Sequence, residues 1–174
     1  MPLQRPVFFT GQLLTAELLA SEQRYQRERT RRAVLATAGP GIVDGLAVRC
    51  TRSEVHVAPG LAIDCLGDVH ELPPPGATLP VPALVDALRW VVLLPVERPG
   101  GLMPTPFGDA VTASYIDEIV EVAIVATAPT RRHARRGRRT VPCGHAHGIC
   151  LARLNVRAGR WRVDRTWRPP RTSP

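Results

Sequence analysis

The chain has 174 residues, a length that suits one ordinary domain with a buried core and a short appendage. Apolar residues make up 44% of it, and the formal net charge is +8, with all 23 basic residues being arginine. This charge fits an acidic protein face or nucleic acid and does not choose between them. The sequence contains no apolar run of about 18 residues and no secretory signal pattern. We therefore expect a cytoplasmic protein with no membrane partner.

The chain opens with an extended apolar segment, residues 1–14, which contains two adjacent phenylalanines. Gly11 breaks this segment, because glycine adopts turn conformations without a steric penalty. We predict that the segment docks into a neighbouring protein; packing of the phenylalanines on their own domain stays open as the alternative. The predicted docking residues are Phe8, Phe9, Gly11, Gln12, Leu13, Leu14, Thr15, Leu18, Gln23 and Tyr25.

A long helix is predicted over residues 15–38. Thr15 stands at the N-cap position, where its hydroxyl can accept a hydrogen bond from a backbone N–H group of the first turn. Strong helix formers follow without a break until Gly39-Pro-Gly41, which cannot continue a helix. The apolar stripe of the first half gives way to arginines in the second half. Such a helix is lightly buried or bridges two bodies.

Within residues 39–164, several segments show the two-residue periodicity of side chains that is typical of β-strands. Strands are predicted from Ile42, around Val55 and Leu61, over Val69–Leu72, Trp90–Glu97, Tyr115–Thr127 and Ile149–Val156, and after a hairpin turn at Ala158-Gly159. Because they follow one another with turns between them, the sequence predicts a mainly β fold. The expected architecture is an N-terminal docking peptide and one long helix, followed by a β-sandwich or partly closed β-barrel domain.

Two stretches of this region are predicted to be irregular. Residues 99–114 are rich in glycine and proline, and a connection of this length often marks an interaction loop. Residues 165–174 contain several prolines and arginines, and we expect them to form a tail unless something holds them.

An arginine-rich loop, residues 129–142, is predicted between two strands. Its arginines are Arg131, Arg132, Arg135, Arg136, Arg138 and Arg139. Such a run can neutralise phosphates, but it contains no aromatic side chain for base stacking, and no nucleic-acid-binding motif accompanies it. We therefore expect the loop to contact an acidic face of a protein partner. A solvated loop and nucleic-acid binding are the alternatives.

The segment between residues 143 and 150 carries two thiols and two imidazoles, the ligands that structural zinc prefers. The candidate zinc ligands are Cys143, His145, His147 and Cys150. Their spacing is not that of a zinc finger. A mixed site drawing on Cys50 or Cys65, a Cys143–Cys150 disulfide, and a plain loop ending in a buried strand cysteine all stay open. Nothing in the sequence requires a cofactor.

Catalytic motifs are absent from the sequence, which has no G-x-S-x-G, phosphate-binding or dinucleotide-binding pattern. Asp64 and Asp68 could be read as a carboxylate pair. Turns beside strands, however, attract aspartate because its side chain bonds to nearby backbone groups. We expect no enzymatic activity.

The opening residues also carry a family resemblance. Phe9, Gly11-Gln-Leu-Leu-Thr15, Leu18, Glu22-Gln23 and Tyr25 resemble the start of small baseplate-associated proteins of phage tails and phage-tail-like contractile injection systems. They are also similar to the N-terminal segment of the type VI secretion baseplate protein that joins the wedge to the membrane complex. The resemblance continues into residues 41–48 and 55–64, and it reappears more faintly at 114–118, 163–164 and 168–169.

This resemblance implies a non-enzymatic structural subunit, present in several copies and incorporated into a phage-tail-like particle. Its N-terminal segment would dock to wedge proteins, and the subunit would link them to a peripheral element. The alternative function is that of a stand-alone arginine-rich nucleic-acid-binding or structural-zinc module.

Overall fold

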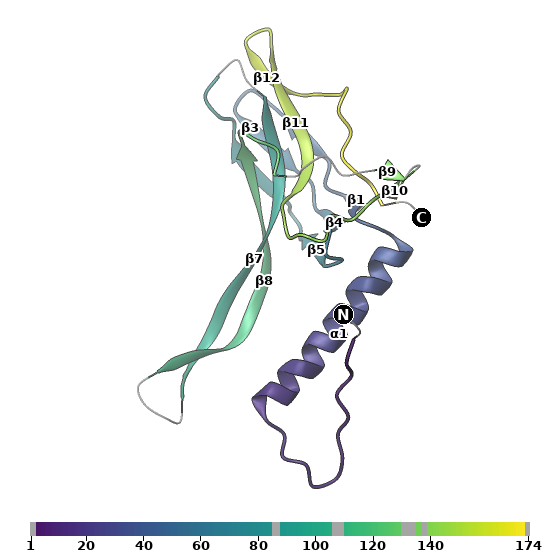
Figure 1. Ribbon diagram of the computed structural model, residues 1–174. Helices are drawn as coiled ribbons and strands as arrows, with labels where there is room; N and C mark the ends of the chain where they lie inside the picture. Colours follow the sequence, from purple (N-terminus) through teal and green to yellow (C-terminus); the bar gives the residue numbers. More distant parts are fainter. Residues whose placement is uncertain (1–2, 85–87, 106–109, 130–134, 137–138, 173–174) are drawn as a thin grey trace.

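The computed structural model describes residues 3–84, 88–105, 110–129, 135–136 and 139–172. Within them the chain forms one helix followed by strands (Figure 1). The elements are α1 (Ala16–Thr37), β1 (Gly41–Gly45), β2 (Val48–Cys50), β3 (Glu54–Val57), β4 (Gly60–Ile63), β5 (Val69–Leu72), β6 (Ala77–Pro80), β7 (Arg89–Pro104), β8 (Val111–Val125), β9 (Arg135–Arg136), β10 (Arg139–Thr140), β11 (Ile149–Arg157) and β12 (Arg160–Val163). The predicted fold class, mainly β with one long helix, is confirmed.

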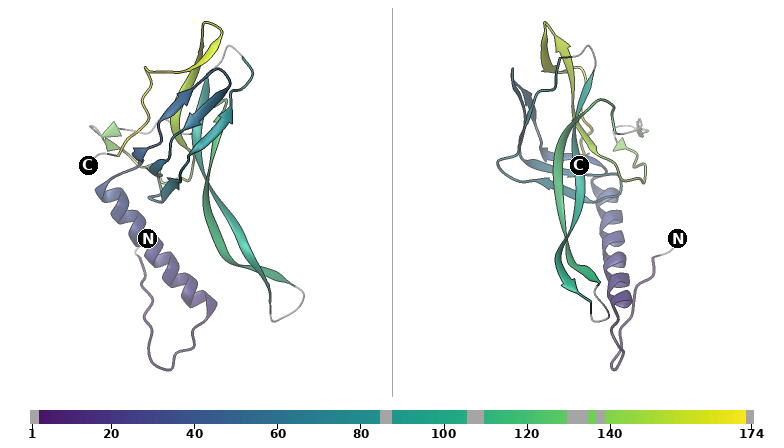
Figure 2. Two further views of the ribbon diagram at one scale, coloured as in Figure 1. Left: turned by 180° about the vertical axis from the view of Figure 1, so that it is seen from behind. Right: turned by 90° about the vertical axis from the view of Figure 1, so that its left-hand side faces the viewer.

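The strands form three antiparallel sheets and one small hairpin. The sheets have the strand orders β1-β4-β5, β2-β3-β6 and β12-β11-β7-β8, and β9 pairs with β10. The two sheets built from β1 to β6 lie on one side of the body, and the β12-β11-β7-β8 sheet lies on the other (Figure 2). Within the described ranges the sheets stay open, so the body resembles a sandwich and not a closed barrel.

The core lies between these sheets. Val91 and Leu93 of β7 and Leu154 of β11 are fully buried, and they belong to one cluster with Val55 and Val57 of β3. Each buried side chain of this size contributes roughly 1.5–3 kcal/mol through the area that it removes from water. The body therefore has its own core, to which α1 adds no buried residue.

β7 and β8 form a long hairpin whose outer half projects beyond the body (Figure 1). They pair from Trp90, opposite Val125, as far as Pro104, opposite Val111. The prediction of a long loop over residues 99–114 is therefore wrong. β11 pairs with β7 only from Arg89 to Leu93. The outer part of β7 thus has an open edge, and proline is tolerated in a strand with such an edge.

The segment after β12 is held against β1. The backbone N–H of Ile42 donates to the carbonyl of Pro170 (2.9 Å), and that of Thr172 donates to the carbonyl of Ile42 (3.1 Å). The ring of Trp167 also meets that of Trp90 edge to face, with centroids 5.3 Å apart. The C-terminal residues were predicted to be a tail unless something held them, and β1 holds them as far as residue 172.

Candidate docking surface and candidate metal centre

The N-terminal segment reverses direction in a tight turn before α1. The backbone N–H of Gln12 donates to the carbonyl of Phe9 (3.1 Å), and the N–H of Phe9 donates to Oε1 of Gln12 (3.2 Å). Gly11 has a φ of +85°, which L side chains rarely adopt, so this turn favours glycine. Gly11 and Gln12 therefore fix the shape of the segment that precedes the helix.

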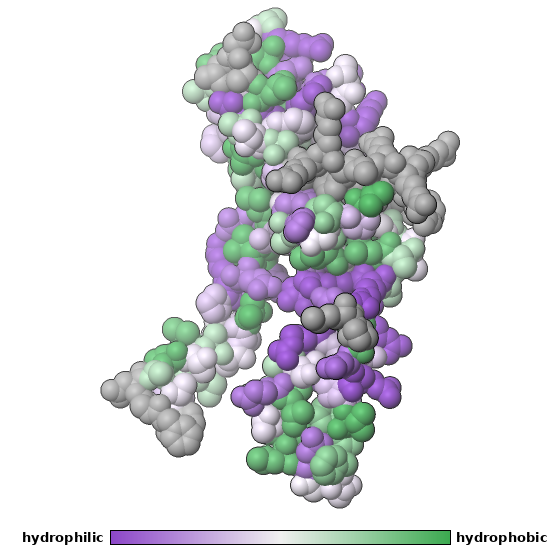
Figure 3. Space-filling view, viewed as in Figure 1, coloured by the Kyte–Doolittle hydropathy of each residue, from purple (hydrophilic) through white to green (hydrophobic). Residues whose placement is uncertain are grey.

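The large apolar side chains of this segment face solvent. Phe9 is 70% exposed and Leu13 is 80% exposed, while Phe8 and Leu14 are 44% and 57% exposed. These fractions disagree with the alternative in which both phenylalanines are buried on their own domain. Figure 3 shows hydrophobic side chains gathered at this end of the molecule. Clustered exposed apolar side chains commonly mark an interaction surface.

α1 carries this surface away from the body. Thr15 is its N-cap, and Oγ1 of Thr15 accepts from the N–H of Leu18 (3.3 Å), as predicted. No residue of the helix is buried; Leu18 and Tyr25 are half-buried, and Gln23 is exposed. The described part of the chain contains no helix apolar and long enough to cross a bilayer. The helix is a strut whose N-terminal end lies far from the β-core (Figure 2).

Two arginines join α1 to the body at the turn between β4 and β5. Arg31 donates to both carboxylate oxygens of Asp68, with 2.7 Å between Nε and Oδ1, and Arg27 reaches Asp68 and, at 3.1 Å, Glu97. The hydrogen bonds from Arg31 hold the pKa of Asp68 below its ordinary value. A Cβ on Gly67 would lie 2.5 Å from the carbonyl oxygen of Arg31, so the helix rests directly on this turn.

Asp64 builds the same turn. Its Oδ1 accepts from the backbone N–H groups of Leu66, Gly67 and Asp68, at 2.8, 2.8 and 3.0 Å. Burial would raise the pKa of Asp64, but the hydrogen bonds from His70 and from the turn outweigh burial and lower it. Asp64 thus stabilises the backbone of the turn, and Asp68 binds the arginines of the helix.

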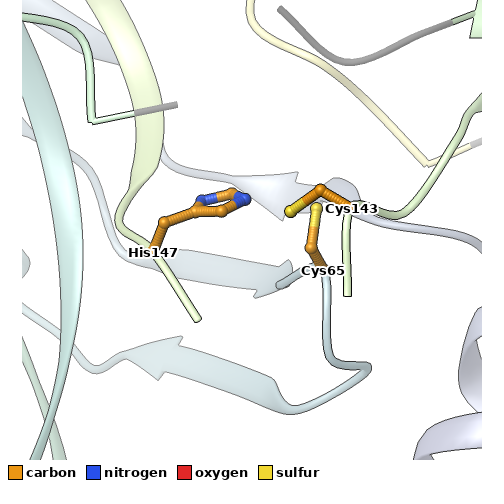
Figure 4. A group of neighbouring side chains, drawn as sticks. All are labelled: Cys65, Cys143 and His147. Atoms are coloured by element: carbon orange, nitrogen blue, oxygen red, sulfur yellow. The ribbon is translucent and has the colours of Figure 1, made fainter. Parts of the chain in front are cut away.

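A candidate metal centre lies beside this turn. The ligand atoms of Cys65, Cys143 and His147 all lie within 4.8 Å of one another. Figure 4 shows the two sulfur atoms side by side and the imidazole ring pointing toward them. Cys65 is buried, His147 is half-buried and Cys143 is exposed. Two thiolates and an imidazole form a ligand set that suits zinc.

The structure brings two of the four ligands predicted from the sequence into this group. Cys143 and His147 belong to the group, but His145 is exposed and Cys150 is buried in β11, and neither belongs to it. Cys65 takes part instead, through the mixed site that the sequence left open. Sequence spacing could not identify Cys65 as the third member, because Cys65 lies in the turn after β4, far along the chain from Cys143 and His147. All four cysteines are thiols in this structure, and burial raises the pKa of Cys65 to about 11.

The arginine-rich loop is described only in part. The backbones of Arg135, Arg136 and Arg139 lie in the hairpin of β9 and β10, where Arg136 pairs with Arg139. The other predicted contact residues, Arg131, Arg132 and Arg138, lie outside the described residues. The expected contact with an acidic face therefore stays a prediction.

Comparisons with known proteins bear on the fold. No protein-family model matches the chain, and no curated protein matches it. A chain of the type VI secretion system TssK-TssF-TssG baseplate subcomplex matches with a TM-score of 0.55 and 13% identity, over 97% of this chain and 62% of that chain. A chain of the type VI secretion baseplate complex matches with a TM-score of 0.54 and 15% identity, over 98% of this chain and 60% of that chain.

The crystal structure of TssK matches with a TM-score of 0.56 and 13% identity, over 98% of this chain and 43% of TssK. The present chain thus spans less than two thirds of the length of each of these three. At such low identity the likeness concerns the fold. Nearly the whole chain, strut helix and β-body together, has a fold found in proteins of the type VI secretion baseplate.

Proposed function

We propose that this protein is a non-enzymatic structural subunit of the baseplate of a contractile injection system or phage tail. The observation that carries the proposal is the exposed apolar segment at the end of α1. A strut with no buried residue has little role in the stability of its own domain, but it suits a connection to another protein. The fold likeness to type VI secretion baseplate proteins, over 97–98% of the chain, supports the same assignment.

The docking segment is proposed to bind the wedge proteins of the baseplate. Burying one large apolar side chain contributes roughly 1.5–3 kcal/mol, and four such side chains are exposed at Phe8, Phe9, Leu13 and Leu14. Binding also orders the segment, and the entropy lost in that ordering opposes this gain. The turn between Phe9 and Gln12 lowers that cost, because part of the segment already has a defined shape.

The outer half of the β7–β8 hairpin offers a second apolar surface. Leu102 is 71% exposed, and Met103, Val111, Tyr115 and Ile116 are each more than half exposed. The hairpin and the N-terminal half of α1 project from the same side of the body (Figure 1, Figure 2). We propose that the wedge proteins contact both projections. The body then faces a peripheral element. The arginine-rich loop of residues 129–142 contacts an acidic surface of that element.

Copurification tests this function. The tagged chain, expressed in cells that make the particle, is expected to copurify with large assemblies that negative-stain microscopy shows as baseplates. The preparation is compared with and without nuclease treatment by gel filtration, and its absorbance at 260 nm is followed. Recovery of a monomer with bound nucleic acid, and no large assembly, would support the nucleic-acid-binding module instead.

A further inference from the structure

We propose that Cys65, Cys143 and His147 bind one zinc ion, which fastens the segment before β11 to the turn between β4 and β5. The three residues come from two parts of the chain that lie far apart in the sequence. Cys65 lies in the turn directly after β4, and Cys143 and His147 lie in the connection between β10 and β11. The proposal is independent of the baseplate function.

The spacing of the ligand atoms fits a tetrahedral ion. With zinc–sulfur distances of about 2.3 Å and zinc–nitrogen distances of about 2.0–2.1 Å, tetrahedral ligand atoms lie roughly 3.3–3.8 Å apart. The three atoms here lie within 4.8 Å of one another, so small side-chain rotations bring them onto the ion. The described residues supply three ligands to this group, and a water molecule would complete the tetrahedron.

Two of the three ligands have fixed positions. Cys65 follows Asp64, whose side chain holds the turn through three backbone hydrogen bonds. Nδ1 of His147 lies 2.9 Å from the carbonyl of Gly148, and with a proton on Nδ1 that donates to this carbonyl, Nε2 would be the ligand atom for the ion. A backbone carbonyl commonly orients a histidine ligand in this way. The exposed Cys143 can then move onto the ion from the solvent side.

One of the three ligands, His147, lies beside a cavity. His147 and Gly148 line a cavity of about 450 Å³ together with Arg31 and Asp68 of the helix junction and Glu97 of β7. The imidazole therefore lies at a surface that solvent reaches, although Cys65 is buried.

Zinc at this position would brace the base of the docking helix. The turn that carries Cys65 also carries Gly67 and Asp68, on which α1 rests through Arg31. A bound ion would add a metal link between this turn and the segment that follows the arginine-rich loop. Loss of the ion should therefore loosen both the segment before β11 and the junction of α1.

The alternative chemistry is a disulfide between Cys65 and Cys143, whose sulfur atoms belong to the same group. A disulfide would use the two sulfurs and leave the imidazole without a part in the bond. Zinc uses all three side chains. The two readings differ in metal content, in the response to chelators and in the role of His147.

Metal content and affinity test the proposal on the full chain purified under reducing conditions. About one equivalent of zinc is expected by elemental analysis, and a strong chelator should lower the melting temperature. His147→Ala and Cys143→Ser should each weaken zinc binding at least tenfold in competition with a chromophoric chelator. His145→Ala and Cys50→Ser are the matched controls and should keep wild-type affinity, since neither residue belongs to the group.

Cobalt substitution gives a second readout. Cobalt bound by wild-type protein should show sulfur-to-metal charge-transfer absorption, and Cys143→Ser should weaken it. Because Cys143 is exposed, this variant should keep its fold. Fresh reduced protein without zinc would overturn the proposal, as would wild-type zinc affinity in His147→Ala. So would a Cys65–Cys143 disulfide, found by mass spectrometry in protein that binds no metal.

Discussion

Gly67 lies so close to Arg31 that a Cβ on the glycine would sit 2.5 Å from the carbonyl oxygen of the arginine. This contact sets the distance between α1 and the β-body. Gly67 also has a φ of +95°, a conformation that a side chain would strain. One residue thus meets a backbone requirement and a packing requirement at once.

Gly67→Ala should therefore loosen the helix as well as strain the turn. Backbone strain of this kind costs roughly 1–3 kcal/mol, and the contact with Arg31 adds to it. Gly159→Ala is the matched control, because Gly159 has a φ of +65° but a Cβ added there would meet nothing within 4 Å. Hydrogen exchange should show faster exchange in α1 for Gly67→Ala than for Gly159→Ala. Equal exchange in the two variants would mean that the turn does not hold the helix.

The acid limit of stability should depend on Asp164. This buried carboxylate accepts hydrogen bonds from Thr166 and Arg153, which lower its pKa to about 2 from an ordinary value of 3.8. Because the folded-state pKa is the lower one, the stabilisation is fully present above about pH 4. It is lost as the pH falls from about 4 to about 2.

Asp164→Asn should lower the melting temperature at neutral pH and flatten its decline over that range. Asp44→Asn, at an exposed position of β1, serves as the control and should keep the wild-type decline. A decline that is the same in Asp164→Asn and the wild type would show that other groups set the acid limit.

The docking segment should matter for assembly and not for the fold. Deleting residues 1–12 should leave the melting temperature of the β-body almost unchanged, because none of the removed residues that the structure describes is buried. The same deletion should remove the protein from purified particles, and Phe9→Ala should reduce its incorporation in milder form. Val69→Ala, at a side chain that is 49% exposed on β5, is a matched control. A deletion that unfolds the domain would place the segment in its own core.

The arginine-rich loop should act collectively. Replacing its six arginines, Arg131, Arg132, Arg135, Arg136, Arg138 and Arg139, with serine should weaken assembly at moderate salt while circular dichroism shows an intact fold. Single replacements should have small effects, because an exposed ion pair contributes roughly 0–1 kcal/mol. If the sixfold variant assembles normally but loses bound nucleic acid, the loop binds nucleic acid and not a protein.

The sequence predicted those features whose signals lie within a few residues. The N-cap at Thr15 depends on one hydroxyl and the first helical turn. The turn at Ala158-Gly159 depends on two residues with positive φ. Such local chemistry can be read without knowing which strands are neighbours.

Features that depend on the tertiary fold were missed. Glycine and proline suggested a loop over residues 99–114, but the ring of Tyr115 covers Gly100 and the two strands continue past it. The link between Arg31 and Asp68 joins a helix to a distant turn, and each residue alone looks like an ordinary surface charge. The sequence offers Cys65 only as one alternative beside Cys50, and the choice between them depends on the fold, which brings Cys65 to Cys143.

The position of the contact at Gly67 means that a small tilt of α1 would displace its N-terminal end by a larger distance. A helix of 22 residues is about 33 Å long at about 1.5 Å per residue. The contact with Gly67 lies in the second half of the helix, at Arg31, and the docking segment precedes its first residue. The free arm from Arg31 to Ala16 is therefore about 22 Å long, and a tilt of about 10° at the turn would displace its tip by about 4 Å. Small changes at one glycine would thus produce a larger displacement at the segment that we propose docks to the partner.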